Sequence, residues 1–310
     1  MTMADRASVS EAIHGNHAGI GAPIFRTPSN AFSVKIPKVP CHLFEEERLA
    51  ALDDATPAGA IALDLSARLG LAYPATTPSL LARYLILDDS SALELSTNAT
   101  GEMYYVASGH GASSKGDVKL EWQAGDVFCM PGGGVTTHRA GRGRGRALLL
   151  QCTDEPMLNF LGVRPRDPAD GVIKPTLYRG SEIDLILKDV HSRAGTDVAG
   201  KAVFCTTPIS EATSTVTPMM VGVINTLEAG GDQRAHRHNA VALTFCIQGE
   251  GCHSVIEGQR VDWRKFGVMV TPPTEAHSHH NCGQELMRSF VMQDSGLYYH
   301  TRAVGFAYCD

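Results

Sequence analysis

The chain has 310 residues, a formal net charge of -6 and 43% hydrophobic residues, which is enough for the packed cores of two ordinary domains. This acidic balance gives no general attraction to nucleic acid or anionic lipid, so we expect no nucleic acid partner. No stretch approaches the roughly 20 apolar residues of a membrane span, and the first residues lack the apolar core of a signal peptide. The eight cysteines form no CxxC pair, which is typical of reduced thiols. We therefore expect a cytoplasmic globular protein with no membrane association.

The first part of the chain, residues 1–75, mixes short polar, Ala-rich and Pro-interrupted segments. One of them, FEEERLAALDDA, has a weak helical periodicity, and we interpret residues 1–75 as an arm with one or two short helices. The following residues, 76–155, contain short β-type runs separated by Gly, Asp and Ser: ARYLILDD, EMYYVASG, VKLEW, GDVFCMP and RALLLQC. This regular spacing predicts an antiparallel barrel or sandwich.

Residues 156–205 contain Pro165, Pro168 and Pro175 and then EIDLILKDVHSR, whose apolar positions fit an amphipathic helix. We interpret this segment as a connector between domains. Across residues 206–310 the β-type runs resume: MMVGVINTLEA, VALTFCIQG, CHSVIEG, QRVDW, FGVMVTP and LMRSFVMQD. Because the two halves share one rhythm, they indicate an internal duplication. The predicted fold class is all-β, with two barrels in one chain, a short helical arm and a connector.

Histidines are concentrated in two stretches of the second half, GGDQRAHRHNAVALTFCIQGEG from Gly230 and GVMVTPPTEAHSHHN from Gly267. Side chains alternate faces along a strand, so His236 and His238 point the same way and can ligate one metal ion. His277, from a neighbouring strand, would complete a cap of three nitrogens. The alternative is a structural role in which these imidazoles only form hydrogen bonds on a surface strand.

The spacing of these histidines matches the cupin pattern, in which a Gly and five residues precede His-x-His and a second Gly follows. The pattern continues with His277 and with Asn281 four residues later. Its usual metal-ligating Glu is Ala242 here, so the ligands are three neutral imidazoles. Such a set leaves the charge of a divalent ion at about +2, with open positions that suit an anionic chelating substrate and dioxygen. The match implies jelly-roll barrels.

The second half also resembles the gentisate and salicylate 1,2-dioxygenases, bicupin ring-cleaving enzymes whose motif runs HRH, an apolar strand, Gly-x-Gly, TP and WHDHGN. The counterparts here are His236-Arg237-His238, Leu243 to Ile247, Gly249-Glu250-Gly251, Thr271-Pro272 and Ala276 to Asn281. The resemblance implies one iron(II) per chain on His236, His238 and His277, with manganese or nickel as alternatives. It also implies that His279 lies beside the substrate and oxygen, and that the chain forms a homodimer or homotetramer.

Strand alternation from His238 predicts that Ala242, Thr244 and Cys246 line the substrate pocket. In the resembling dioxygenases the position of Thr244 is typically Arg, which binds the substrate carboxylate. A threonine cannot form that bidentate ion pair, so the change favours a substrate without a carboxylate.

Three other positions are candidates for substrate contact. Arg237 and Arg288 are cations that an anionic substrate could meet, although a solvated side chain is the alternative for each. Ala276 replaces the bulky Trp of the resembling enzymes, which predicts a roomier pocket.

In the first barrel the cupin pattern retains its glutamate, Glu102, whereas its histidine positions fall on Ser96 and Asn98. His138 is displaced by two residues from the third ligand position. Because one His and one Glu hold a metal poorly, we expect no metal here. The resemblance by itself would place the iron in this barrel.

These features predict an iron-dependent, extradiol-type dioxygenase that cleaves the ring of a salicylate- or gentisate-like compound with O₂, as in aromatic hydrocarbon catabolism. One alternative is a dioxygenase for a hydroquinone-like substrate without a carboxylate. The others are a cupin isomerase that uses its metal as a Lewis acid and a non-catalytic ligand-binding cupin.

Overall fold

The computed structural model describes residues 23–32, 35–143, 145–193 and 201–309. The chain is divided into two compact units, Met1–Pro37 and Lys38–Asp310. The described part of the first unit includes a turn in which the Asn30 amide donates to the Thr27 carbonyl, 2.9 Å away. Residues 1–22 of the predicted arm and 194–200 of the predicted connector lie outside the described residues.

The first barrel consists of two antiparallel sheets. The larger has the order β11-β8-β5-β10-β3-β2, and the smaller has the order β4-β9-β6-β7. The strands of the larger sheet are β2 (Gly59–Ala62), β3 (Leu81–Leu87), β5 (Gly101–Ser108), β8 (Val127–Pro131), β10 (Ala147–Thr153) and β11 (Thr176–Tyr178). Those of the smaller sheet are β4 (Leu93–Ser96), β6 (His110–Lys115), β7 (Val118–Gln123) and β9 (Val135–Ala140).

The second barrel repeats this arrangement, with sheets in the orders β1-β18-β15-β20-β13-β12 and β17-β16-β19-β14-β21. The strands of its larger sheet are β1 (His42–Leu43), β12 (Lys201–Cys205), β13 (Val221–Leu227), β15 (Ala242–Gln248), β18 (Val268–Thr271) and β20 (Met287–Gln293). Those of its smaller sheet are β14 (Asp232–His238), β16 (Cys252–Ile256), β17 (Gln259–Asp262), β19 (His277–Asn281) and β21 (Phe306–Tyr308). The predicted all-β fold with two barrels is confirmed.

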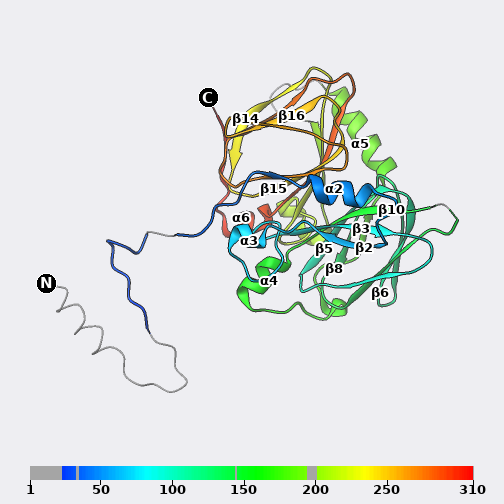
Figure 1. Ribbon diagram of the computed structural model, residues 1–310, viewed down its shortest axis with the longest axis horizontal. Helices are drawn as coiled ribbons and strands as arrows, with labels where there is room; N and C mark the ends of the chain where they lie inside the picture. The colour runs from blue at the N-terminus through cyan, green and yellow to red at the C-terminus, as the bar shows by residue number, and fades with distance from the viewer. Residues whose placement is uncertain (1–22, 33–34, 144, 194–200, 310) are drawn as a thin grey trace. The chain divides into compact units, whose positions relative to one another are not determined.

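Helices are short and lie between or beside the barrels (Figure 1). They are α2 (Glu45–Leu52), α3 (Ser66–Leu69), α4 (Glu155–Leu161), α5 (Gly180–Ser192) and α6 (Ser295–Thr301), with 3-10 turns at Pro168–Asp170 and Pro208–Thr213. The helices predicted from FEEERLAALDDA and EIDLILKDVHSR are α2 and α5. Strands from the predicted arm and from the predicted connector extend sheets of both barrels. The predicted domain boundaries stay a prediction.

The barrels pack against each other through their larger sheets. Because alternate residues of each strand face opposite sides, one face of such a sheet meets the other barrel and the other face lines its own barrel. On β3, Tyr84 belongs to the core shared by both barrels, whereas Leu85 belongs to the interior of the first barrel. In the shared core the Tyr105 ring lies 5.6 Å from Phe245 and 5.5 Å from Phe290. The two barrels therefore share one apolar core.

A hydrogen-bonded side-chain trio occurs once in each barrel. In the first, Trp122 Nε1 donates to Ser113 Oγ at 2.8 Å, and this hydroxyl lies 2.7 Å from His138 Nδ1. The second copy, with the same two distances, consists of Trp263, Ser254 and His279. Because the three positions recur at one constant interval along the chain, they support the predicted duplication.

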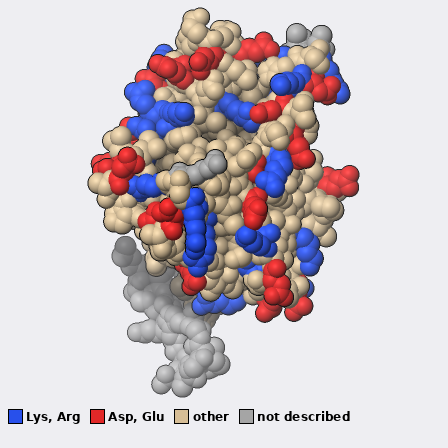
Figure 2. Space-filling model, turned by 90° about the vertical axis from the view of Figure 1, so that its right-hand side faces the viewer, with Lys and Arg blue, Asp and Glu red and all other residues tan. Residues whose placement is uncertain are grey.

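The surface drawn in Figure 2 carries Lys and Arg interspersed with Asp and Glu. This face offers no continuous positive area among the described residues to attract polyanions. None of the described helices has both the length and the apolar character needed to cross a membrane.

Candidate metal centre

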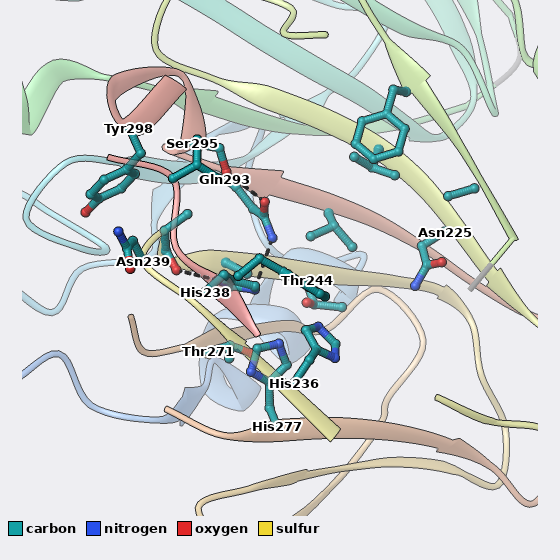
Figure 3. A pocket seen from close by; sticks show the side chains of 18 of the residues that line it. Asn225, His236, His238, Asn239, Thr244, Thr271, His277, Gln293, Ser295 and Tyr298 are labelled. Carbon is teal, nitrogen blue, oxygen red and sulfur yellow. Dashed lines mark hydrogen bonds between the residues drawn. The ribbon is translucent and has the colours of Figure 1, made fainter. Parts of the chain in front are cut away.

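Three histidines from two adjacent strands converge inside the second barrel (Figure 3). His236 and His238 lie on β14, and His277 begins β19, where it pairs directly with His236 across the antiparallel ladder. One nitrogen from each ring lies within 4.8 Å of the other two. Within the described part of the chain, this trio is the one group of His, Cys, Asp or Glu side chains with such spacing. The structure thus brings the three predicted ligands together.

Each ring of the trio is oriented by a backbone carbonyl. The Nδ1 atoms of His236, His238 and His277 lie 2.9, 2.8 and 2.9 Å from the carbonyl oxygens of Arg234, Ala240 and Glu275. A carbonyl oxygen can only accept, so Nδ1 carries the hydrogen and Nε2 keeps its lone pair. Metal-ligating histidines are typically held in this way, and the three Nε2 atoms are therefore ready to bind a cation.

Burial keeps these imidazoles neutral. It lowers the pKa of His277 to about 3, with a further contribution from neighbouring His236. Burial also lowers the pKa of His236 and of His238. Because a divalent ion binds only the neutral form of imidazole, the trio is in its metal-binding state at neutral pH. Three nitrogen ligands with the remaining positions open fit iron(II), and also manganese or nickel.

His279, predicted to lie beside the substrate, is buried and lines the same cavity as the trio. Its Nδ1 lies 2.7 Å from Ser254 Oγ, which also accepts from Trp263 Nε1. Among the described residues the Ser254 hydroxyl has no other acceptor in reach, so it donates to Nδ1. The His279 hydrogen is then on Nε2, which is the opposite of the tautomer in the metal-binding trio. His279 therefore offers a donor to a molecule in the cavity.

The cavity around the trio has a volume of about 510 Å³, within the roughly 300–1,000 Å³ of typical ligand pockets. The first barrel is filled at equivalent positions. Leu81 pairs with Thr153 as Val221 pairs with Gln293, which makes the first-barrel residues Leu85 and Tyr104 the counterparts of the second-barrel residues Asn225 and Thr244. Large buried side chains are thus replaced by smaller polar ones, and space opens inside the second barrel.

Only part of the set of residues predicted to contact the substrate lines the cavity. Ala242 and Thr244 line the cavity. Cys246 shares their strand face but packs with Cys252 and Trp263 in a small apolar cluster.

The other three candidates are absent from the residues described as lining this cavity. Arg288 forms an ion pair with Asp184 on α5 at 2.5 Å, and Arg237 is exposed. Ala276 precedes β19, with its amide hydrogen-bonded to Glu257. We therefore leave Cys246, Arg237, Arg288 and Ala276 out of the proposed substrate contacts.

Two polar groups that the sequence reasoning missed also line the cavity. Gln293 Nε2, at the end of β20, lies 3.3 Å from His238 Nε2 and is drawn beside it in Figure 3. Thr271 is buried, and its hydroxyl has no hydrogen-bond partner among the described residues. The register of β15 with β18 places Thr271 next to Ala242, and in the sequence its signal is the Thr271-Pro272 counterpart of the TP motif.

In the first barrel, the counterparts of His236 and His238 lie one residue earlier in the chain than the sequence predicts. Leu95 on β4 pairs with Thr136 on β9 as His236 pairs with His277. The counterpart of the second ligand is therefore Thr97.

The expected positions, Ser96 and Asn98, are each one residue too late. The chain between Thr97 and Glu102 is one residue longer than the chain between His238 and Ala242, so counting back from the glutamate misplaces the slots. Asn98 instead donates to the Asn159 side chain at 2.8 Å.

A buried ion pair occupies this part of the first barrel. Lys115 Nζ lies 2.9 Å from Glu102 Oε1, and both side chains are almost fully buried. Thr97 and Thr136, the counterparts of two metal ligands, donate to the same carboxylate at 2.5 and 2.6 Å. An ammonium group therefore lies where the second barrel presents its imidazoles.

Comparisons with known proteins agree with this geometry. The family described as "Cupin domain" matches residues 223–292. A 5-nitrosalicylic acid 1,2-dioxygenase from Bradyrhizobium sp. is 28% identical over 89 residues, which cover 29% of this chain and 42% of that protein. The chain thus matches less than half the length of this curated relative.

Solved structures match over much more of the chain. Salicylate 1,2-dioxygenase from Pseudoaminobacter salicylatoxidans, as an adduct with gentisate, gives a TM-score of 0.75 at 15% identity, covering 99% of this chain and 94% of that one. Oxalate decarboxylase from Bacillus subtilis, studied for its Mn(II) centres, gives 0.54 at 14% identity, covering 80% and 74%. At such identities the likeness concerns the fold. This chain has the two-barrel fold of salicylate 1,2-dioxygenase, and its second barrel contains the segment that matches the cupin domain family.

Proposed function

We propose that the protein is a non-haem iron(II) dioxygenase that cleaves the ring of a hydroxylated aromatic compound with O₂. The observation that carries the proposal is the trio of oriented, neutral imidazoles that lines a ligand-sized cavity. Similarity to a nitrosalicylate dioxygenase and the salicylate dioxygenase fold support it. The dimer or tetramer expected from the resemblance stays a prediction.

Iron(II) held by His236, His238 and His277 would supply a charged centre at which a phenolate and dioxygen can react. The residues around it would bind and orient the substrate. Thr271 and Gln293 would donate hydrogen bonds to its oxygen atoms, and the Nε2–H of His279 would stabilise negative charge that develops on them. In the overall reaction one ring carbon–carbon bond breaks and both atoms of O₂ enter the product, so no external reductant is required.

Replacing His279 with glutamine should leave the metal bound while kcat/KM falls about 10²- to 10⁴-fold, the usual contribution of one positioned proton donor. Metal analysis and steady-state kinetics of the same preparation check both parts. Loss of the metal in this variant would instead show that His279 is itself a ligand.

Ser254→Ala should reduce kcat/KM about five- to tenfold, because one hydrogen bond of roughly 1 kcal/mol that fixes the His279 ring is lost. The matched control is Ser113→Ala, which removes the same contact in the first barrel and should leave activity per folded molecule unchanged. Nitrogen NMR of the metal-free protein should show a mixed His279 tautomer only in Ser254→Ala. Equal kinetic effects of both substitutions would contradict the positioning role.

Oxygen uptake by anaerobically iron-loaded protein tests the proposal. Gentisate, substituted salicylates and hydroquinones are added in turn while the ultraviolet spectrum is followed. We expect stoichiometric uptake with loss of the aromatic band for at least one of them. Substrate conversion that does not consume oxygen would replace the proposal with the isomerase alternative, and binding of these compounds without conversion would favour a ligand-binding cupin.

A further inference from the structure

The cavity of the second barrel has no charged side chain among the described residues that line it. Two arginines on strands of this barrel, Arg288 and Arg234, have partners elsewhere. Arg288 is paired with Asp184, and the Arg234 guanidinium lies over the Tyr308 ring, 4.5 Å from its centroid. With three neutral imidazoles, the bound metal would be the one positive charge available to a ligand.

A carboxylate is poorly matched to such a cavity. If it binds the metal through one oxygen, the other oxygen still needs a cation or several donors, because an unpaired buried charge is costly. An arginine would supply a bidentate contact, but the residues that line the cavity from β15 are Ala242 and Thr244, both buried. A threonine hydroxyl offers one neutral hydrogen bond instead.

The polar groups that are present suit neutral oxygen atoms. Thr271 has a buried hydroxyl without a partner among the described residues, and Gln293 extends its amide beside His238. Asn225, on β13, lines the other side of the cavity in Figure 3. Hydroxyl and amide dipoles of this kind pair with phenol or carbonyl oxygens without a charge on either side.

The walls and mouth of the cavity are apolar. Val223 and Val291 line its interior strands, while Phe204 on β12 and Phe306 on β21 contribute from edge strands. Phe204 and Phe306 are 52% and 50% exposed. Large apolar side chains that remain exposed beside a pocket are typical of surfaces that contact a ligand. The cavity therefore has room and surface for an apolar group beyond the ring that meets the metal.

From this arrangement we infer that the substrate is an uncharged hydroxylated aromatic compound with an apolar substituent, rather than a benzoate. The inference rests on the proposed dioxygenase function and specifies its substrate class. Thr244 is the residue that determines specificity, since it takes the place from which a cation would bind a carboxylate. The lack of a cationic side chain among the described lining residues disfavours carboxylates, and the apolar mouth favours substituents that extend toward it.

Gentisate and its methyl ester form a matched pair for testing this inference, because they share one dihydroxylated ring and differ in charge. Binding is measured by calorimetry on zinc-loaded protein, in which no turnover occurs. We expect the ester to bind at least tenfold more tightly than the acid. Longer alkyl esters should gain up to about fourfold in affinity for each methylene that contacts the apolar wall.

Thr244→Arg should reverse this preference and favour the acid, because it places a cation in the cavity. Thr244→Gln, which adds length without charge, is the control and should keep the preference for the ester. A wild-type protein that binds and oxidises gentisate better than its ester would overturn the substrate inference and leave the dioxygenase function intact. If neither compound binds and iron-loaded protein consumes no oxygen with any phenol, the proposed function itself fails.

Discussion

Replacing His238 with alanine should leave the protein with less than about a tenth of its metal after loading and desalting, because two imidazoles hold a labile divalent ion poorly. His238 has its Nδ1 fixed by the Ala240 carbonyl at 2.8 Å, so its Nε2 is a preorganised ligand whose loss neighbours cannot replace. Activity should fall in proportion to the metal. Elemental analysis of iron per chain, with iron supplied anaerobically, measures the effect.

His300→Ala is the matched control for this experiment. His300 is an exposed residue of α6 and is absent from the cavity lining, so this variant should retain one metal ion per chain. Full iron content in His238→Ala would remove His238 from the ligand set. Two ions per wild-type chain would show that the first barrel also binds metal.

Replacing Lys115 with methionine should lower the free energy of unfolding by about 3–5 kcal/mol, the usual cost of removing one partner of a buried ion pair. The Lys115 ammonium also donates to the carbonyl oxygens of Pro131 and Gly133, at 2.5 and 2.8 Å. In the variant, the Glu102 carboxylate would stay buried without a counter-charge. Urea denaturation of metal-free protein measures the loss.

Two comparisons separate this effect from a general loss of a lysine. Lys119→Met removes an exposed ion pair within β7, between Lys119 and Glu121, so it should cost less than about 1 kcal/mol. The double variant Glu102→Leu/Lys115→Met should recover most of the stability, because it leaves no unpaired buried charge. A cost below about 1 kcal/mol for Lys115→Met alone would show that the ion pair does not hold the first barrel together.

Most of the fold could be predicted from hydrophobic runs, but strands β6 and β9 of the first barrel could not. β6 and β9 are partly exposed on one face, and on the other they bury polar side chains such as Ser113, Thr136 and His138. Their sequences therefore show no alternation of apolar and polar residues, which is the usual signal for a strand. Burial of polar groups by mutual hydrogen bonding leaves no such signal in a single sequence.

The site was predictable where its geometry is local. His236 and His238 share a strand, so period-2 alternation alone places them on one face, and the cupin spacing supplies His277. Gln293 and Thr271 were missed because their place in the cavity depends on the register between β15 and its neighbours. For Cys246, alternation gave the correct face but not the depth along the barrel, where Trp263 covers it.

Mass spectrometry of the product formed under isotopically labelled dioxygen tests the dioxygenase proposal most directly. Iron-loaded protein is given a hydroxylated aromatic compound that supports oxygen uptake, and the ring-opened product is collected before it exchanges with water. We predict that both labelled oxygen atoms appear in a single product molecule. Incorporation of one atom or none would contradict the proposal, because it would indicate a monooxygenase, an oxidase or a reaction that does not use oxygen as a substrate.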